Sequence, residues 1–173
     1  MAGNRPGYGL IALMVALGLL SGCAATPMTE QITASPPPGM PVTYELNHVP
    51  FFAQEQYFCG PAALATVLNA TGLETEPDSL AQTIYTPGRQ GTLQTEILTG
   101  ARRQGRLALP VRRLSDVFLN VADGRPVLIL QNLSLEIVPL WHYAVLVGFD
   151  LPGQTVLLRS GTTRRHEMPM ETF

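Results

Sequence analysis

Three side chains in this sequence have the types and spacing for nucleophilic acyl transfer: Cys59, His142 and Gln54. Cys59 directly precedes Gly60-Pro61 and a helical pattern, so the positive end of the helix would favour its thiolate, the nucleophilic form. His142 begins an apolar strand and could accept the thiol proton. Gln54, five residues before Cys59, could donate an amide N–H to a developing oxyanion. Gln56 is the second candidate for that donor.

Each of these residues also has an ordinary structural explanation. A free cysteine is often a small buried apolar residue, a histidine at the start of a buried strand is often a core residue, and Gln54 could lie in a surface loop. The combination favours the chemical interpretation. His48 and His166 are predicted to be surface residues. No spacing of cysteine, histidine and carboxylate residues suggests a metal site, and we expect no cofactor.

Residues 1–22 have the pattern of an export signal. Arg5 precedes an apolar run of about eleven residues from Leu10 to Leu20, which is shorter than the roughly 20 that a membrane-spanning helix needs. Leu20-Ser21-Gly22-Cys23 then ends the run, which predicts a bacterial lipoprotein with diacylglycerol on the Cys23 thiol. The alternative is an ordinary secretory signal. Ala24 favours an outer-membrane lipoprotein facing the periplasm.

Lipidation of Cys23 would leave Cys59 without a partner, because the sequence contains two cysteines. In an oxidising compartment paired cysteines usually form disulfides, so an unpaired thiol there favours a chemical role. The segment 23–43 is rich in proline and has no apolar period. It predicts an extended, solvated tether between the membrane and a single domain spanning residues 44–173. The net charge of −2 and the lack of a basic stripe make nucleic acid an improbable partner.

Helices are expected in the first half of this domain and strands in the second. An extended lead-in at 47–52 precedes three helices at 59–69, 77–84 and 93–103, and a fourth helix is expected at 115–121. Strands are expected at 107–111, 127–130, 142–149 and 155–159, the last two as a hairpin. The order predicts an α+β domain with an antiparallel sheet.

The ordered motifs resemble those of a known peptidase family. Gln54-x4-Cys59-Gly60-Pro61-Ala62-Ala63-Leu64, a Gly-Arg-Pro-Val-Leu strand and His142-Tyr143-Ala144-Val145 look like the papain-like peptidases that remove bacteriocin leaders after a double glycine. The stand-alone lipoprotein subset of that family is the most similar. The resemblance covers about residues 49–165. It implies a papain-like fold with Cys59 as nucleophile, His142 as general base and acid, and Gln54 as oxyanion donor.

The sequence departs from this family at the group that orients the histidine. The family has an acidic residue at the end of the strand after the histidine strand, where this sequence has Ser160. Asn132 is a second candidate, because it could approach from a neighbouring strand end. Asp150 is excluded, because it lies at the far end of the strand from His142, more than about 20 Å away.

We therefore expect a lipid-anchored thiol peptidase of the bacterial envelope that acts on a peptide or protein substrate through an acyl-enzyme. Two alternatives remain: a peptidoglycan amidase or endopeptidase, and a papain-like binding or assembly module without useful catalysis, which the absent carboxylate favours. Residues 164–173 read as the approach to another strand or helix, so the chain could be a fragment or a shortened family member.

Overall fold

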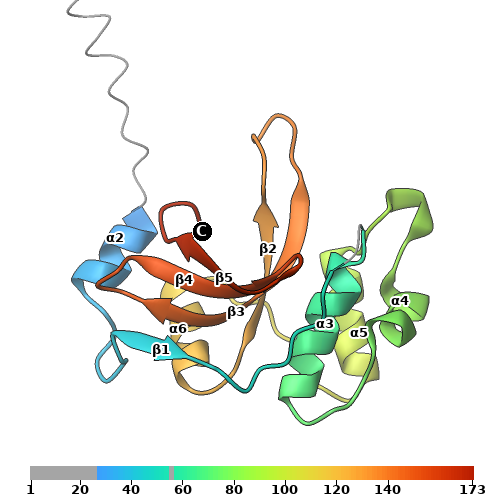
Figure 1. Cartoon of the computed structure of the whole chain (residues 1–173), viewed down its shortest axis with the longest axis horizontal. Coiled ribbons are helices and arrows are strands. Elements are labelled where there is room, and N and C mark those ends of the chain that lie inside the picture. Colours follow the sequence, from blue (N-terminus) through green and yellow to red (C-terminus); the bar gives the residue numbers. More distant parts are fainter. Residues whose placement is uncertain (1–26, 55–56) are drawn as a thin grey trace, which may run out of the picture.

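The structure is a computed structural model and describes residues 27–54 and 57–173. Its elements in chain order are α2 (Pro27–Ala34), β1 (Thr43–Glu45), α3 (Cys59–Ala70), α4 (Pro77–Ile84), the 3-10 helix η1 (Pro87–Arg89), α5 (Gln94–Arg103), α6 (Leu114–Ala122), β2 (Val127–Asn132), β3 (Trp141–Asp150), β4 (Thr155–Ser160) and β5 (Thr163–Pro169). The helices come first and the main strands follow (Figure 1). The α+β prediction is confirmed.

Strand β3 organises the sheet. β2 pairs antiparallel with its first half and β1 with its second half, while β4 pairs along its other edge and β5 continues beyond β4. Residues 143–149 of β3 are all buried. A strand that is buried on both faces has a nearly continuous run of apolar residues in its sequence, and residues 143–149 form such a run. His142 stands at the start of this strand, where burial begins.

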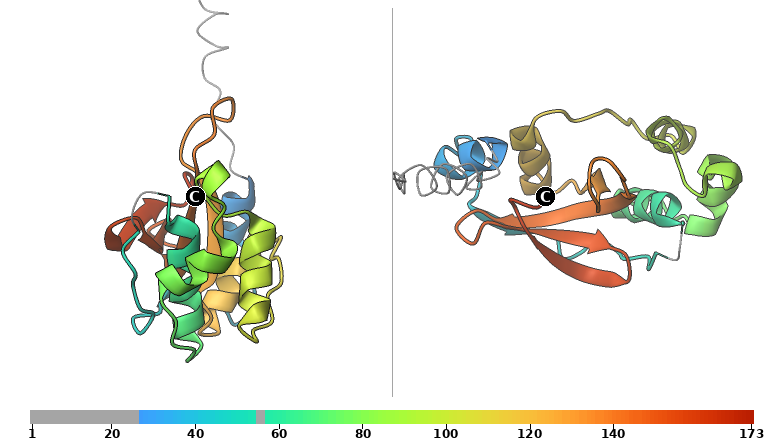
Figure 2. Two further views of the ribbon diagram at one scale, coloured as in Figure 1. Left: turned by 90° about the vertical axis from the view of Figure 1, so that its right-hand side faces the viewer. Right: turned by 90° about the horizontal axis from the view of Figure 1, so that it is seen from above.

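The helices lie along one side of the sheet. Figure 2, seen from above, shows α3 and α6 against the sheet and α4 and α5 farther out beside α3. Helix α3 is buried almost all round, and α6 anchors the other end of the domain through Phe118, whose ring lies 4.9 Å from that of Phe149 on β3. Helix α3, which begins at Cys59, is therefore held centrally between the sheet and α4 and α5.

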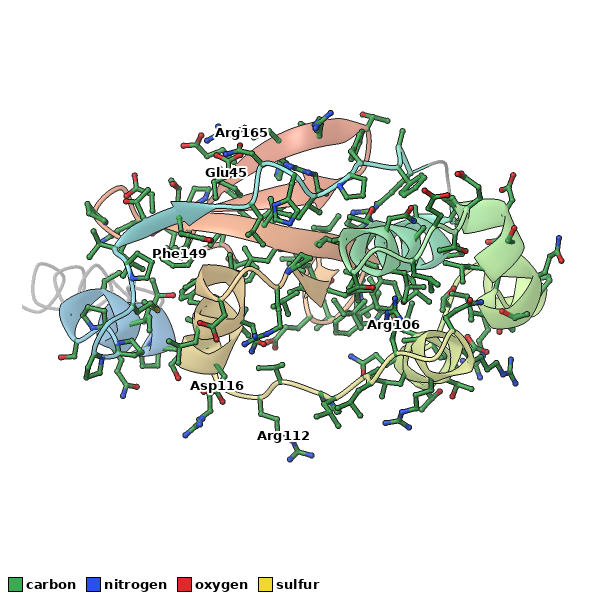
Figure 3. All side chains as sticks on the ribbon, turned by 90° about the horizontal axis from the view of Figure 1, so that it is seen from below. Glu45, Arg106, Arg112, Asp116, Phe149 and Arg165 are labelled. Atoms are coloured by element: carbon green, nitrogen blue, oxygen red, sulfur yellow. The ribbon has the colours of Figure 1, made fainter. Side chains whose placement is uncertain are left out.

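The segment between β1 and α3 crosses the sheet and is tied to it by arginines. Arg159 on β4 is 3% exposed, and its guanidinium donates to the carbonyl groups of Leu46, Val49 and Arg164. Arg165 on β5 forms an ion pair with Glu45 on β1 at 3.1 Å. Figure 3 labels the two side chains, which lie near each other on this side of the sheet. Backbone oxygens satisfy the buried cation, and they fix the path of the chain that leads to Gln54.

The sequence-based helix predictions are confirmed within one or two residues, but one of the strand predictions is wrong. Residues 107–111 form no strand, because Leu107 and Leu109 are 84% and 65% exposed and pair with no neighbour in the sheet. The approach to a further element after Arg164 is strand β5, which the prediction left undecided. Among the described residues, no helix is both long and apolar enough to cross a membrane.

The predicted extended tether is also wrong for its second part. Pro27–Ala34 is a helix, and it packs on the domain: Ile32 is buried and the Thr29 hydroxyl donates to the Met170 carbonyl. Proline at the first helical position is compatible with a helix start. A single apolar residue gave no visible period, so only its burial near α6 shows that this segment belongs to the folded body. Residues 23–26, with Cys23, lie outside the described residues.

Candidate active site

Cys59 is the first residue of α3, and its thiol is free and half-buried. The preceding residue, Phe58, caps the helix without any side-chain hydrogen bond, and the first turn of the helix contains no acidic residue. Phe58 stacks on Tyr85 at the end of α4 with ring centroids 5.1 Å apart. Tyr57 adopts a φ of 71°, which is unusual for an aromatic residue. The chain thus turns sharply and is held in place immediately before Cys59.

Gly60 has a packing role that the sequence did not reveal. A Cβ at this position would lie 2.6 Å from the Cβ of Thr92. The missing side chain therefore admits the loop before α5, not a ligand. The Thr92 hydroxyl is buried and finds no hydrogen-bond partner among the described residues. Thr92 also lines the groove described below, which brings this loop beside Cys59.

His142 is held by the neighbouring strand β4. Its Nε2 lies 3.1 Å from the Ser160 hydroxyl oxygen, in hydrogen-bond contact. This contact leaves Nδ1 as the ring nitrogen for a second partner. Burial lowers the pKa of His142, and the nearby His166 on β5 lowers it further. A lowered pKa keeps the imidazole neutral, and the neutral form is the one that can accept a proton from a thiol.

Gln54 is fixed by the turn between β4 and β5. Its backbone N–H donates to the Gly161 carbonyl at 2.9 Å, and its side-chain Oε1 accepts the Gly161 N–H at 3.1 Å. Because a backbone N–H can only donate, the oxygen of the Gln54 amide must face it. The Nε2 group, with its two donors, therefore points away from the turn.

Asn132 does not orient His142. It pairs with Trp141 across β2 and β3, while Gln131 pairs with His142, so Asn132 and His142 lie on opposite faces of the sheet. The Asn132 Oδ1 instead accepts the N–H groups of Ser134 and Leu140 in the loop between these strands. Asp150 is at the far end of β3, where it accepts a hydrogen bond from Thr43.

The three candidate residues open onto one groove with a volume of about 1030 Å³. Cys59 comes from α3, His142 from β3 and Gln54 from the lead-in, and Gly161 closes the same side. Tyr143 lines the groove as well. Its pKa is raised to about 12, first by burial and then by the neighbouring Cys59 and Glu96. The phenol therefore stays protonated beside Cys59.

The groove has one polar wall and one apolar wall. Residues 89–95 form the polar wall, which Glu96 holds in shape by accepting the N–H of Leu93 and the hydroxyl of Thr86. The apolar wall contains Leu130, Leu133, Leu140 and Trp141 from β2, β3 and their connecting loop. The groove therefore offers both polar and apolar contacts to a bound molecule.

Several residues of this site escaped sequence reasoning. Thr92, Tyr143 and Gly161 gave no chemical signal because their importance comes from contacts with residues far away in the sequence. His166 was predicted to be a surface residue, but it is half-buried and close enough to His142 to influence it. Gln56 lies outside the described residues. Among the residues that the structure describes, no cluster of histidine, cysteine or carboxylate groups could hold a metal ion.

Comparison with protein-family models shows to which family this chain belongs. The Peptidase_C39 like family matches residues 46–173, which is most of the chain. This chain belongs to that family. The match includes Gln54, Cys59, His142 and Ser160, so all the groove residues discussed above fall inside it.

A solved structure supports the same relationship at the level of the fold. The chain is similar to the peptidase domain of Streptococcus ComA, a bi-functional ABC transporter involved in a quorum sensing pathway. The TM-score is 0.53 and the sequence identity 21%, covering 73% of this chain and 90% of that one. The comparison with curated proteins finds no significant match. Together with the family match, the similarity makes the fold a papain-like peptidase fold.

Proposed function

We propose that this protein is a cysteine peptidase of the bacterial envelope that hydrolyses peptide bonds through a thioester on Cys59. The observation that carries the proposal is the convergence of Cys59, His142 and Gln54 on one groove. The turn at Ser160 and Gly161 contacts both His142 and Gln54. Membership of the Peptidase_C39 like family supports a peptide or protein substrate.

The site residues suit an acyl-enzyme mechanism. His142 takes the proton of the Cys59 thiol through Nδ1, and the sulfur attacks the scissile carbonyl carbon. The oxyanion receives hydrogen bonds from the Gln54 Nε2 group and from backbone N–H groups at the start of α3. The imidazolium then protonates the leaving amine. A water molecule, deprotonated by the same imidazole, attacks the thioester and releases the acid and the free thiol.

Ser160 takes the position where a carboxylate was expected, and it holds the imidazole by a neutral hydrogen bond. A serine fixes the ring orientation but stabilises an imidazolium less than a carboxylate would. We therefore propose a working but slow peptidase. The same feature favours the second candidate function, a binding or assembly module with the peptidase fold and no useful turnover.

We also propose that Cys23 carries the lipid that attaches the protein to the envelope, with the outer membrane and its periplasmic face as its location. The support is the sequence Leu20-Ser21-Gly22-Cys23 after the apolar run, together with Ala24. These residues lie outside the described part of the chain. Mass spectrometry of the chain purified from membranes would detect the diacylglycerol, and Cys23→Ala would abolish it.

The Cys–His pair is tested by alkylation. In a Cys23→Ala background Cys59 is the only thiol, so iodoacetamide labelling from about pH 4 to about pH 10 follows it alone. We expect fast labelling that persists toward low pH and becomes slower at low pH in His142→Ala. His48→Ala is the matched control, and it should leave the profile unchanged. A profile that is identical in all three proteins would overturn the mechanism.

Turnover is tested with a peptide library prepared from envelope proteins and analysed by mass spectrometry. Cleavage that is lost in Cys59→Ser would establish the peptidase. A chain that cleaves nothing, while its Cys59→Ser variant supports cell growth as well as the wild type, would establish the binding module instead.

A further inference from the structure

The loop between β2 and β3 exposes an unusual amount of apolar surface. Six large apolar side chains lie within nine residues, and their exposed fractions are 49% for Leu133, 68% for Leu135, 86% for Ile137, 67% for Val138, 60% for Leu140 and 60% for Trp141. Glu136 is the only charged residue in this stretch. A contiguous apolar display of this kind marks a contact with a partner or a membrane. We call residues 133–141 the apolar hairpin.

Hydrogen bonds hold the backbone of the apolar hairpin in one conformation. Asn132 accepts two of its N–H groups, the Leu133 N–H donates to the Leu140 carbonyl at 2.9 Å, and the Val138 N–H donates to the Leu135 carbonyl at 3.0 Å. These hydrogen bonds hold the base of the loop closed and form a turn at its tip. Figure 1 shows the hairpin projecting well beyond the body of the domain. Its tip can therefore contact a flat surface while the rest of the domain stays clear of it.

The position of α2 limits how far the domain can lie from a membrane. Only three residues lie between Cys23 and Pro27, and the four Cα–Cα steps from one to the other span at most about 14 Å even when fully extended. Because α2 packs on the domain through Ile32 and Thr29, the folded body begins within that reach of a lipid on Cys23. Figure 1 shows that α2 begins on the same side of the molecule as the hairpin tip.

We propose that the apolar hairpin inserts its side chains into the interfacial region of the bilayer that carries the lipid anchor. The proposal rests on the lipid attachment included in the proposed function. The hairpin has no basic residue, so zwitterionic lipids suffice and the contact is apolar. Trp141, at the base of the hairpin, has the amphipathic ring that prefers the membrane–water interface.

Insertion would also orient the groove. Leu133, Leu140 and Trp141 belong both to the apolar hairpin and to the apolar wall of the groove. With the tip in the bilayer, the groove opens beside the lipid surface. The substrates are then peptide segments that emerge from the membrane or lie on it, in preference to freely diffusing peptides.

Trp141 is the only tryptophan in the sequence, so its fluorescence reports on the hairpin alone. The test uses the mature lipidated chain, reconstituted in phosphatidylcholine vesicles with or without brominated acyl chains. We expect at least twofold quenching by the brominated lipid and a blue-shifted emission. Equal emission in both kinds of vesicle, at the wavelength of a water-exposed indole, would overturn the proposal.

Two pairs of substitutions complete the test. Ile137→Asp with Val138→Asp places charges at the tip without changing any groove residue, and it should abolish the quenching. Leu107→Asp with Leu109→Asp is the matched control. It removes two equally exposed apolar residues from the α5–α6 connection, which Figure 2 shows along another side of the molecule, and it should leave the quenching unchanged. Quenching that responds equally to both pairs would overturn the proposal.

The experiments distinguish an error in the hairpin proposal from an error in the proposed lipid anchor or in the proposed peptidase activity. If the mature chain carries no lipid on Cys23, the same soluble chain is added to the vesicles. Quenching then supports hairpin insertion without the anchor, and its absence overturns it. The Ile137→Asp and Val138→Asp variant should cleave a soluble peptide at the wild-type rate. If the tip pairs copies of the chain instead, sedimentation without lipid will show a dimer that this variant loses, and Trp141 will not be quenched.

Discussion

Two connections lie near His142 at the start of β3, and they differ in length, polarity and hydrogen bonding. The β4–β5 turn, at Gly161 and Thr162, is short, and its backbone and neighbours are joined by hydrogen bonds to Gln54 and His142. The β2–β3 loop on the other side is longer and apolar, and its side chains are exposed. Both connections border the same groove through Gly161 on one side and Leu133 and Leu140 on the other.

The difference suggests two separate roles: the β4–β5 turn positions side chains of the groove, and the β2–β3 loop contacts something outside the chain. The β4–β5 turn holds polar groups at fixed distances, which catalysis requires, because displacement by about 1 Å can cost 10²-fold in rate. The β2–β3 loop holds its own backbone and leaves its side chains for something outside the chain. Substitutions in the turn should therefore change the rate of the chemical step, and substitutions at the tip of the loop should change only where the protein lies.

The largest expected effect comes from removing the group that the turn positions. Gln54→Ala should lower kcat by about 10²–10³, because the variant lacks the side-chain amide that we propose as the oxyanion donor. Steady-state kinetics with a soluble peptide measures this, and Leu135→Ser in the loop is the control that should retain the wild-type kcat. An equal kcat for both variants would contradict the division between turn and loop.

The next effect should come from the turn itself. Gly161 has a φ of 56° with open space around its Cα, so a side chain there meets backbone strain and no clash. Gly161→Val should lower the free energy of unfolding by about 1–3 kcal/mol and should lower kcat, because Gln54 and Ser160 would shift together. Gly39→Val, at another positive φ but far from the groove in sequence, should lower stability without lowering kcat in the folded protein.

A smaller and opposite pair of effects is expected at Ser160. Ser160→Ala removes the hydrogen bond to Nε2 and should reduce kcat several-fold, whereas Ser160→Asp should increase it by stabilising the imidazolium. The carboxylate should also raise the pKa of His142. NMR titration of the His142 ring and the pH profile of kcat measure the two effects. A Ser160→Asp variant with an unchanged His142 titration would show that this side chain does not orient the ring.

The smallest effect is on stability at low pH. Burial and His166 lower the pKa of His142 below its usual 6.5, so the unfolded chain binds this proton first as the pH falls. The free energy of unfolding should therefore decrease as the pH drops below about 6.5, and His142→Gln should make that decrease shallower. Urea denaturation at about pH 7.5 and about pH 5 measures it. Equal decreases in both proteins would contradict the assignment.

The sequence was informative where the relevant contacts are local. Helix α3 was predicted from its first residue because Cys59, Gly60 and Pro61 carry a local start signal, and the apolar run after His142 indicated β3. The prediction of a strand at 107–111 was wrong, because alternating apolar residues form a buried strand only where a neighbouring strand can pair with them. Helix α2 was not predicted, because a single buried isoleucine does not produce the repeating apolar pattern by which a helix is recognised in a sequence.

The sequence by itself determined the chemistry of this protein: which thiol, imidazole and amide exist, and that a helix starts at the thiol. Only the tertiary structure decided that Ser160, not Asn132, contacts His142, because strand register assigns side chains to opposite faces. It also decided that Gly60 makes room for Thr92, that one turn holds both Gln54 and His142, and that the apolar residues 133–141 stay outside the core. Each of these depends on distances between residues far apart in the chain, which no local pattern encodes.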